Sequence, residues 1–288
     1  MCAEMGLSSA RPRIGIGSFA FRYNIGFAGF QPPSPMSVLG FLEEAYNLGY
    51  EGVQLCENLN YVDLGKEELL EVKKRAEELG LFIETGMKNI TLDNVKRHLE
   101  IAEILSSKML RIVVGENGVY PEENSVELRN RAVHILSSVL PQCISKGIRI
   151  GLENHFDLPT ADLIQIIREI NSPEIGLIFD TTNALGFTER PEETLEAIGA
   201  HLISIHLKDY NIRKVEAGYL ITGTVLGEGR LNTKDILKKA LQINPGLSII
   251  LEMTTRRDEN YQLGEVIAWE KDVVKSSTEY LFKTVSQI

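Results

Sequence analysis

The chain alternates short apolar runs with longer amphipathic stretches, and the alternation continues from one end to the other. The short runs have the length and β-branched content of buried strands, whereas the stretches between them have a helical period. Repeated βα units predict parallel strands, and eight such units can close into a barrel. We therefore predict a (β/α)8 barrel whose strands are Ile14–Phe21, Gly52–Cys56, Phe82–Gly86, Met109–Val114, Ile148–Glu153, Ile175–Asp180, Leu202–Leu207 and Leu247–Glu252.

The helical stretches carry their own start and stop signals. Residues Lys66–Leu79 place apolar groups on one face and Glu or Lys on the other, and Gly80 should end this helix. Gly49 and Gly147 are expected to end two other helices in the same way.

No linker or change of composition divides the 288 residues, so we expect a single domain over residues 1–288. An open, doubly wound sheet that binds a nucleotide would need a complete glycine fingerprint after its first strand. Gly15 and Gly17 lack the third glycine and lie inside the predicted strand, which disfavours that alternative.

Charge and composition exclude several classes of partner. The formal net charge of -10 disfavours nucleic acid, since a negative surface repels phosphate backbones. No run of about 20 apolar residues predicts a membrane span, and the N-terminal residues do not resemble a signal peptide. Three widely spaced cysteines fit a reduced setting, so we expect a cytoplasmic protein, with a homo-oligomer left open.

Four predicted strands end in residues that can bind a metal ion. Glu153, Asp180, His206 and Glu252 end strands five to eight, and the carboxyl ends of barrel strands converge on one mouth. The alternation in strand seven predicts that Ile203 faces the helices and His206 faces the interior. Crowded carboxylates repel one another unless a cation offsets them, and an oxygen-rich set suits Mn²⁺, Mg²⁺ or Co²⁺. Any one such residue alone would more often be a rim ion pair.

These strand ends resemble those of a known family. Leu-Glu-Asn-His at Glu153, Phe-Asp-Thr-Thr-Asn at Asp180, His-Leu-Lys-Asp at His206 and Leu-Glu-Met at Glu252 are similar to the metal-binding segments of the sugar phosphate isomerase/epimerase group. That group belongs to the xylose-isomerase-like (AP endonuclease 2) TIM barrel superfamily. The turn from Leu226 to Arg230 also resembles the loop that follows strand seven in the family.

The resemblance implies a metal-dependent isomerase or epimerase of a small sugar or keto-sugar, with Mn²⁺ as the expected ion. Proton abstraction next to a carbonyl, through a metal-stabilised enediolate, would use Glu153 and Glu252 as the acid/base pair. The ketose 3-epimerases carry a histidine three residues after the strand-six aspartate, where this chain has Asn183. Lys208 is shared with dehydratase-like members, so an inosose-dehydratase-like lyase stays open.

Other residues near the predicted strand ends are candidates for contact with the substrate. The predicted substrate-binding residues are Arg22, His155, Asn183, Lys208 and Arg230, and further residues that follow strands are Glu57, Lys88, Glu116 and Arg256. Each has an alternative role in packing or in a rim ion pair.

Two other functions compete with the sugar enzyme. An endonuclease of the same fold would need several histidines at the mouth to hold three metal ions, and a basic face to bind DNA. This chain has five histidines in all, only two of them at strand ends, and a net charge of -10, so the endonuclease is disfavoured. A metal-binding barrel without catalysis is the second alternative, and turnover of a keto-sugar would exclude it.

Overall fold

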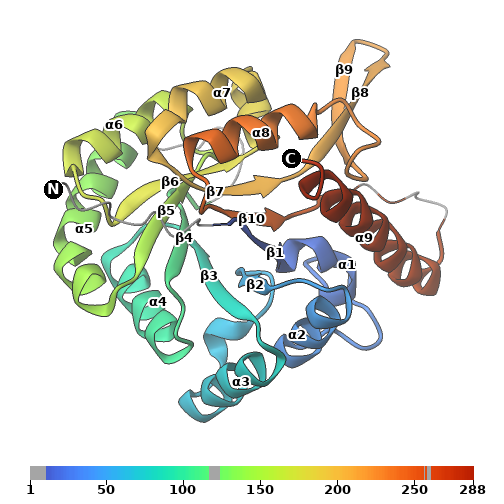
Figure 1. The fold of residues 1–288 in the computed structure, drawn as a ribbon, viewed down its shortest axis with the longest axis horizontal. Helices are drawn as coiled ribbons and strands as arrows, with labels where there is room; N and C mark the ends of the chain where they lie inside the picture. Colours follow the sequence, from blue (N-terminus) through green and yellow to red (C-terminus); the bar gives the residue numbers. More distant parts are fainter. Residues whose placement is uncertain (1–10, 117–123, 256, 258–260) are drawn as a thin grey trace, which may run out of the picture.

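The computed structural model describes residues 11–116, 124–255, 257 and 261–288. Eight parallel strands form a closed barrel, in the order β1-β2-β3-β4-β5-β6-β7-β10 with β10 paired to β1 (Figure 1). They are β1 Arg13–Gly17, β2 Gly52–Leu55, β3 Phe82–Lys88, β4 Met109–Val113, β5 Arg149–Glu153, β6 Ile175–Asp180, β7 Leu202–Leu207 and β10 Ser248–Leu251.

Helices surround the barrel and cover the outer face of its strands (Figure 1). They are α1 Arg22–Ile25, α2 Val38–Asn47, α3 Lys66–Leu79, α4 Leu92–Ile104, α5 Ser125–Lys146, α6 Thr160–Ile170, α7 Pro191–Ile198, α8 Thr233–Ile243 and α9 Leu263–Val285. Short 3-10 turns lie at Ser18–Phe21, Tyr61–Asp63, Asn183–Phe187 and Gly199–His201. The part of the chain that the structure describes has no helix long and apolar enough to cross a membrane.

The core lies mainly between the strands and the helices. Strands β2, β4 and β7 are buried at every position, as expected for parallel strands that are covered on one face by helices and closed on the other by the barrel. The predicted helix ends are confirmed, because Gly80 and Gly147 cap α3 and α5 in the left-handed conformation that favours glycine.

The first strand is shorter than predicted. It ends at Gly17, and Ser18–Phe21 turn away as a 3-10 helix. The Ser18 hydroxyl bonds Asn58 Oδ1 at 2.6 Å and accepts from the Cys56 backbone N–H at 3.0 Å. These bonds hold the 3-10 turn in place, so the strand ends at Gly17 even though the apolar run continues to Phe21 in the sequence.

An antiparallel hairpin that we did not predict follows β7. It consists of β8 Asp209–Val215 and β9 Gly218–Thr224, which pair along their whole length. The hairpin projects from the barrel beside α8 (Figure 1). Apart from Asp209, every residue of its two strands is exposed or half-buried, and polar and apolar side chains are mixed, so the apolar periodicity that reveals barrel strands is weak there.

The prediction for Ile203 is wrong. A shift of register between β6 and β7 at Leu177/Ile178 makes the pairing irregular, so strict alternation fails at the start of β7. Ile203 packs with Met109 and Ile178 instead of facing the helices. His206, after the irregularity, still lies in the buried interior as predicted.

Candidate metal centre and substrate cavity

The four predicted metal ligands lie together at one end of the barrel. One ligand atom from each of Glu153, Asp180, His206 and Glu252 falls within 4.8 Å of the others, and all four residues are buried. They come from β5, β6, β7 and the residue that follows β10. Adjacent parallel strands therefore bring together residues that are up to 99 positions apart in the sequence.

Backbone and side-chain bonds orient Asp180. Its Oδ1 accepts from the backbone N–H groups of Thr182 and Asn183, both at 2.9 Å. The Asn154 side chain bonds the Asp180 backbone N–H at 2.7 Å and its carbonyl at 3.0 Å. These bonds leave Oδ2 of Asp180 directed at the cluster, where it lies 2.8 Å from Lys208 Nζ.

His206 lies between the two glutamates. Its Nδ1 is 2.9 Å from Glu252 Oε2 and 3.3 Å from Glu153 Oε2. Burial opposes a charge on the imidazole, but the carboxylates of Glu153 and Glu252 outweigh it and raise the pKa of His206 to about 10. Burial likewise disfavours the charged form of Glu252, but Lys208 and His206 outweigh it and lower the pKa of Glu252 to about 2.

Two buried cations complete the cluster. Lys208 Nζ lies 3.5 Å from Glu252 Oε2, in addition to its contact with Asp180. Arg111, in β4, donates from Nε to Glu153 Oε2 and from Nη1 to Glu57 Oε2, the latter at 3.1 Å. Arg111 was not among the predicted site residues. An arginine within the otherwise apolar run of β4 is nevertheless a sequence feature that indicates a buried charge.

The cluster fits a divalent cation on two counts. Glu57, Glu153, Asp180 and Glu252 carry four negative charges against the two positive charges of Arg111 and Lys208, so a divalent ion would balance them. The buried His206 Nε2 also has no hydrogen-bond partner, and Asp180 Oδ2 and Glu252 Oε2 have their contacts only with Lys208 and His206 inside the cluster. In the metal-free protein, a proton on His206 supplies part of the missing positive charge.

A cavity of about 320 Å³ opens beside the cluster. Glu252, Lys208 and Arg111 form its charged floor, and the hairpin contributes Ile221 and Thr222 to its wall. Of the predicted substrate-binding residues, His155, Asn183 and Lys208 line this cavity, as does Glu57. Asn183 also donates from Nδ2 to Glu153 Oε1 at 3.0 Å.

The remaining candidates lie elsewhere. The guanidinium of Arg22 lies 4.3 Å from the ring centre of Phe27, and Arg230 is exposed with its backbone N–H bonded to the Tyr210 carbonyl. Lys88 and Glu116 are exposed, and Arg256 lies outside the described residues.

The turn that resembles the family loop has a structural basis. Asp209, next to Lys208, accepts at 3.0 Å from the backbone N–H groups of Gly227, Gly229 and Leu231. A Cβ at Gly229 would collide with the Asp209 carboxylate. The Asp209 carboxylate therefore links the first residue of β8 to the turn at residues 227–231, which follows β9.

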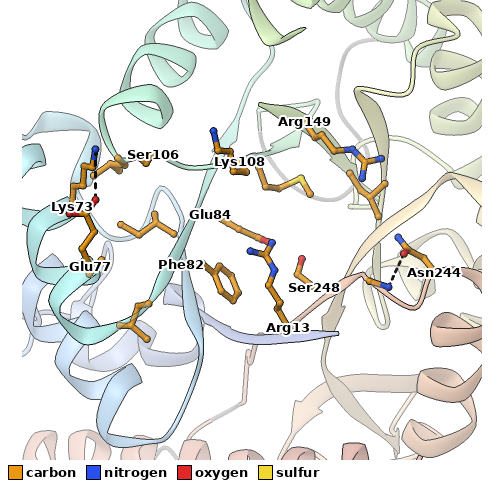
Figure 2. A pocket seen from close by; sticks show the side chains of 17 residues that line it. Arg13, Lys73, Glu77, Phe82, Glu84, Ser106, Lys108, Arg149, Asn244 and Ser248 are labelled. Carbon is orange, nitrogen blue, oxygen red and sulfur yellow. Dashed lines mark hydrogen bonds and ion pairs between the residues drawn. The ribbon is translucent and has the colours of Figure 1, made fainter. Parts of the chain in front are cut away.

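A second cavity, of about 280 Å³, lies at the opposite end of the barrel (Figure 2). Three of the four cations that line it have local partners: Arg13 stacks on Phe82, Lys73 pairs with Glu77, and Arg149 donates to the Pro173 carbonyl. The amino-terminal face of such barrels usually serves stability, and these contacts agree with that role.

Together the fold and the cluster define a (β/α)8 barrel with a candidate metal centre at the carboxyl-terminal mouth. The model of the xylose isomerase-like TIM barrel family matches residues 42–273. The chain belongs to this family, as the sequence resemblance predicted.

Several characterised proteins are similar to the chain. The 3-oxo-isoapionate decarboxylase of Pectobacterium atrosepticum is 27% identical over 233 residues, which cover 80% of this chain and 81% of the relative. A crystal structure of D-psicose 3-epimerase has a TM-score of 0.75 at 13% identity and covers 95% of this chain and 99% of its own. A Mycobacterium smegmatis protein of the same fold, in complex with magnesium, has a TM-score of 0.68 at 16% identity, with coverage of 95% and 99%. The two structures show similarity in fold, and these relatives include a decarboxylase and a sugar epimerase.

Proposed function

We propose that the protein is a divalent-metal-dependent isomerase or epimerase of a small keto-sugar. Glu153, Asp180, His206 and Glu252 would hold the ion, and Mn²⁺ is the expected metal, with Mg²⁺ or Co²⁺ as alternatives. When bound, the ion would polarise a substrate carbonyl and the neighbouring hydroxyl, and so acidify the C–H bond between them.

The position of Glu252 carries this proposal. Of the four proposed ligands, Glu252 is the one that lines the cavity, where its Oε2 lies 2.9 Å from His206 Nδ1 and 3.5 Å from Lys208 Nζ. A carboxylate placed in this way can take the proton from a substrate carbon and return it to the same or a neighbouring carbon. Glu153 is the proposed second acid/base, but Arg111 and Asn183 bond its oxygens, so it would have to exchange one of these bonds to act.

A second candidate, a lyase, is favoured by Lys208. Its ammonium group lines the cavity next to Glu252, where it can attract a substrate carboxylate or protonate a leaving hydroxyl. In decarboxylation of a 3-oxo acid, the bond between the α-carbon and the carboxylate breaks and CO₂ leaves. The electron pair passes into the ketone to form an enediolate or enolate, and a proton then adds to the α-carbon. The similarity of the chain to the 3-oxo-isoapionate decarboxylase supports this alternative.

Incubation in D₂O with added Mn²⁺ tests both candidates. Ketoses, inososes and 3-oxo sugar acids would be screened by NMR, and released CO₂ would be measured in parallel. Deuterium at a carbon next to the carbonyl, in a product that has lost neither water nor CO₂, supports the isomerase or epimerase, whereas stoichiometric CO₂ or a dehydrated product supports the lyase. A metal-loaded protein that does neither on any compound of these classes contradicts the proposed activity.

Glu252→Gln should abolish exchange while the fold is retained, because Gln keeps the size of the side chain but cannot accept the proton. Glu228→Gln, at an exposed turn, is the matched control. Glu153→Gln should also lose exchange, except that in a two-base epimerase Glu153→Gln and Glu252→Gln each keep exchange with the epimer whose proton faces the surviving carboxylate. Parental exchange in Glu252→Gln at full metal occupancy would exclude this carboxylate as the base.

Small keto-sugars, and no nucleic acid, are the proposed partners. The cytoplasmic location remains part of the same proposal and rests on the three widely spaced cysteines, and a homo-oligomer stays open.

A further inference from the structure

Arg111 is an unusual residue for the interior of a barrel. It lies in the middle of β4, its side chain is only 2% exposed, and its neighbours along the strand are apolar. Burial of a guanidinium away from water costs free energy unless its N–H groups and its charge find partners. A role in filling the interior would be served at lower cost by leucine or methionine.

The hydrogen-bond partners of Arg111 lie on both sides of β4 in the barrel. Nε donates to Glu153, which ends β5, and Nη1 bonds Glu57, which follows β2 and lies in the cavity wall. Nη1 also lies 3.5 Å from the Met87 carbonyl of β3. The planar guanidinium is therefore anchored at one edge by Glu57 and Met87 and bonds a proposed metal ligand at another.

Glu153 has little freedom left. Arg111 bonds Oε2, and Asn183 Nδ2 bonds Oε1 at 3.0 Å, so the two oxygens are held from β4 and from the 3-10 turn after β6. A carboxylate that is fixed in this way presents a defined oxygen and lone pair to the centre of the cluster. Removal of a group that orients a metal ligand commonly lowers metal affinity or activity by about 10- to 100-fold.

We propose that Arg111 is a positioning residue of the metal centre: anchored on Glu57, it sets the orientation in which Glu153 meets the ion. This inference rests on the proposed metal site. Removal of Arg111 would have two opposing effects on affinity, because loss of its positive charge favours a cation while loss of orientation disfavours binding. The geometry of coordination is therefore the decisive measurement.

Co²⁺ alone serves as the probe, since its visible absorption depends on the number and arrangement of its ligands. The parent protein, Arg111→Ala, Arg111→Lys and Arg149→Ala would be titrated with Co²⁺. Arg149 begins β5 at the opposite end of the barrel and gives a matched control for loss of an arginine. Each protein would be measured with and without millimolar guanidinium, which can enter the space that Arg111→Ala opens on the cavity.

We expect Arg111→Ala to alter the Co²⁺ spectrum, guanidinium to restore it, and Arg149→Ala to keep the parental spectrum. A parental spectrum in Arg111→Ala overturns the inference, and so does an altered spectrum that guanidinium does not restore, since that result indicates general repacking. If Arg111→Ala does not fold, Arg111→Lys decides by the same spectrum, because one ammonium cannot reproduce the fork between the two carboxylates. Failure of the parent itself to bind Co²⁺ would instead contradict the metal site.

Discussion

At the scale of single residues, His206 and Glu252 make the stability of the metal-free protein depend on pH in opposite directions. The folded state raises the pKa of His206 from 6.5 to about 10, so its contribution is fully present below pH 6.5 and is lost as the pH rises through 10. The folded state lowers the pKa of Glu252 from 4.5 to about 2, so its contribution is present above pH 4.5 and is lost as the pH falls through 2.

We therefore predict that the free energy of unfolding of the metal-free protein declines from pH 7 to pH 10. Urea unfolding with a chelator present measures it. His206→Asn should show a shallower decline, because asparagine takes up no proton over this range. If the parent and the variant have the same slope, the imidazole is not held in its charged form by the two glutamates.

At the scale of elements, the clamp between Asp209 and the turn at residues 227–231 is the feature with the clearest energetic consequence. Asp209→Ala leaves three backbone N–H groups without their acceptor, which should cost about 3 kcal/mol of unfolding free energy. Asp272→Ala, an exposed change in α9, should stay within about 0.5 kcal/mol of the parent. Urea unfolding compares them, and equal midpoints would show that water replaces the carboxylate at little cost.

Two glycine substitutions give an independent test of the same clamp. Gly229→Ala should destabilise the protein, because its Cβ would collide with the Asp209 carboxylate. Gly264→Ala in α9 has open space around its Cβ and should be neutral or stabilise by up to about 1 kcal/mol. Thermal unfolding would separate the two, and a neutral Gly229→Ala would mean that the turn can move away from Asp209.

At the scale of the whole molecule, the metal ion should act as a stabilising ligand of the barrel, since its four proposed ligands come from four strand ends. At a free Mn²⁺ concentration 100 times the dissociation constant, binding should add about 2.7 kcal/mol to the free energy of unfolding. Differential scanning calorimetry should show the midpoint rise in the parent and little rise in Asp180→Ala. An equal rise in both proteins would place the bound ion elsewhere.

Much of this architecture is predictable from the sequence because parallel barrel strands follow a simple rule. Each strand is a short apolar run, and a metal-competent residue at its end must point into the shared mouth, as Glu153 and Asp180 do. What could not be predicted depends on local hydrogen bonds or irregular pairing. The turn at Ser18 follows from side-chain bonds, the inward position of Ile203 from a register shift, and the hairpin from pairing between exposed strands.

Arg111 shows the limit of reasoning from strand ends. It lies in the middle of β4, two positions before the end of the strand, and its partners Glu57 and Glu153 are 54 and 42 residues distant. Only the closed barrel brings these three side chains together, so the sequence shows an anomalous arginine but not what it binds.

The clamp at the base of the hairpin makes this segment a separable module. Asp209 bonds the turn directly, and the Arg230 backbone N–H bonds the Tyr210 carbonyl, so both ends of the insertion are fastened beside Lys208. Residues beyond this base, including Ile221 and Thr222 in the cavity wall, can then be replaced without moving β7 or its histidine. Hairpins of other lengths and sequences could be grafted in place of residues 211–222 to reshape substrate preference, while the turn bonded to Asp209, the bridge between Gly223 and Thr255, and the proposed metal centre stay intact.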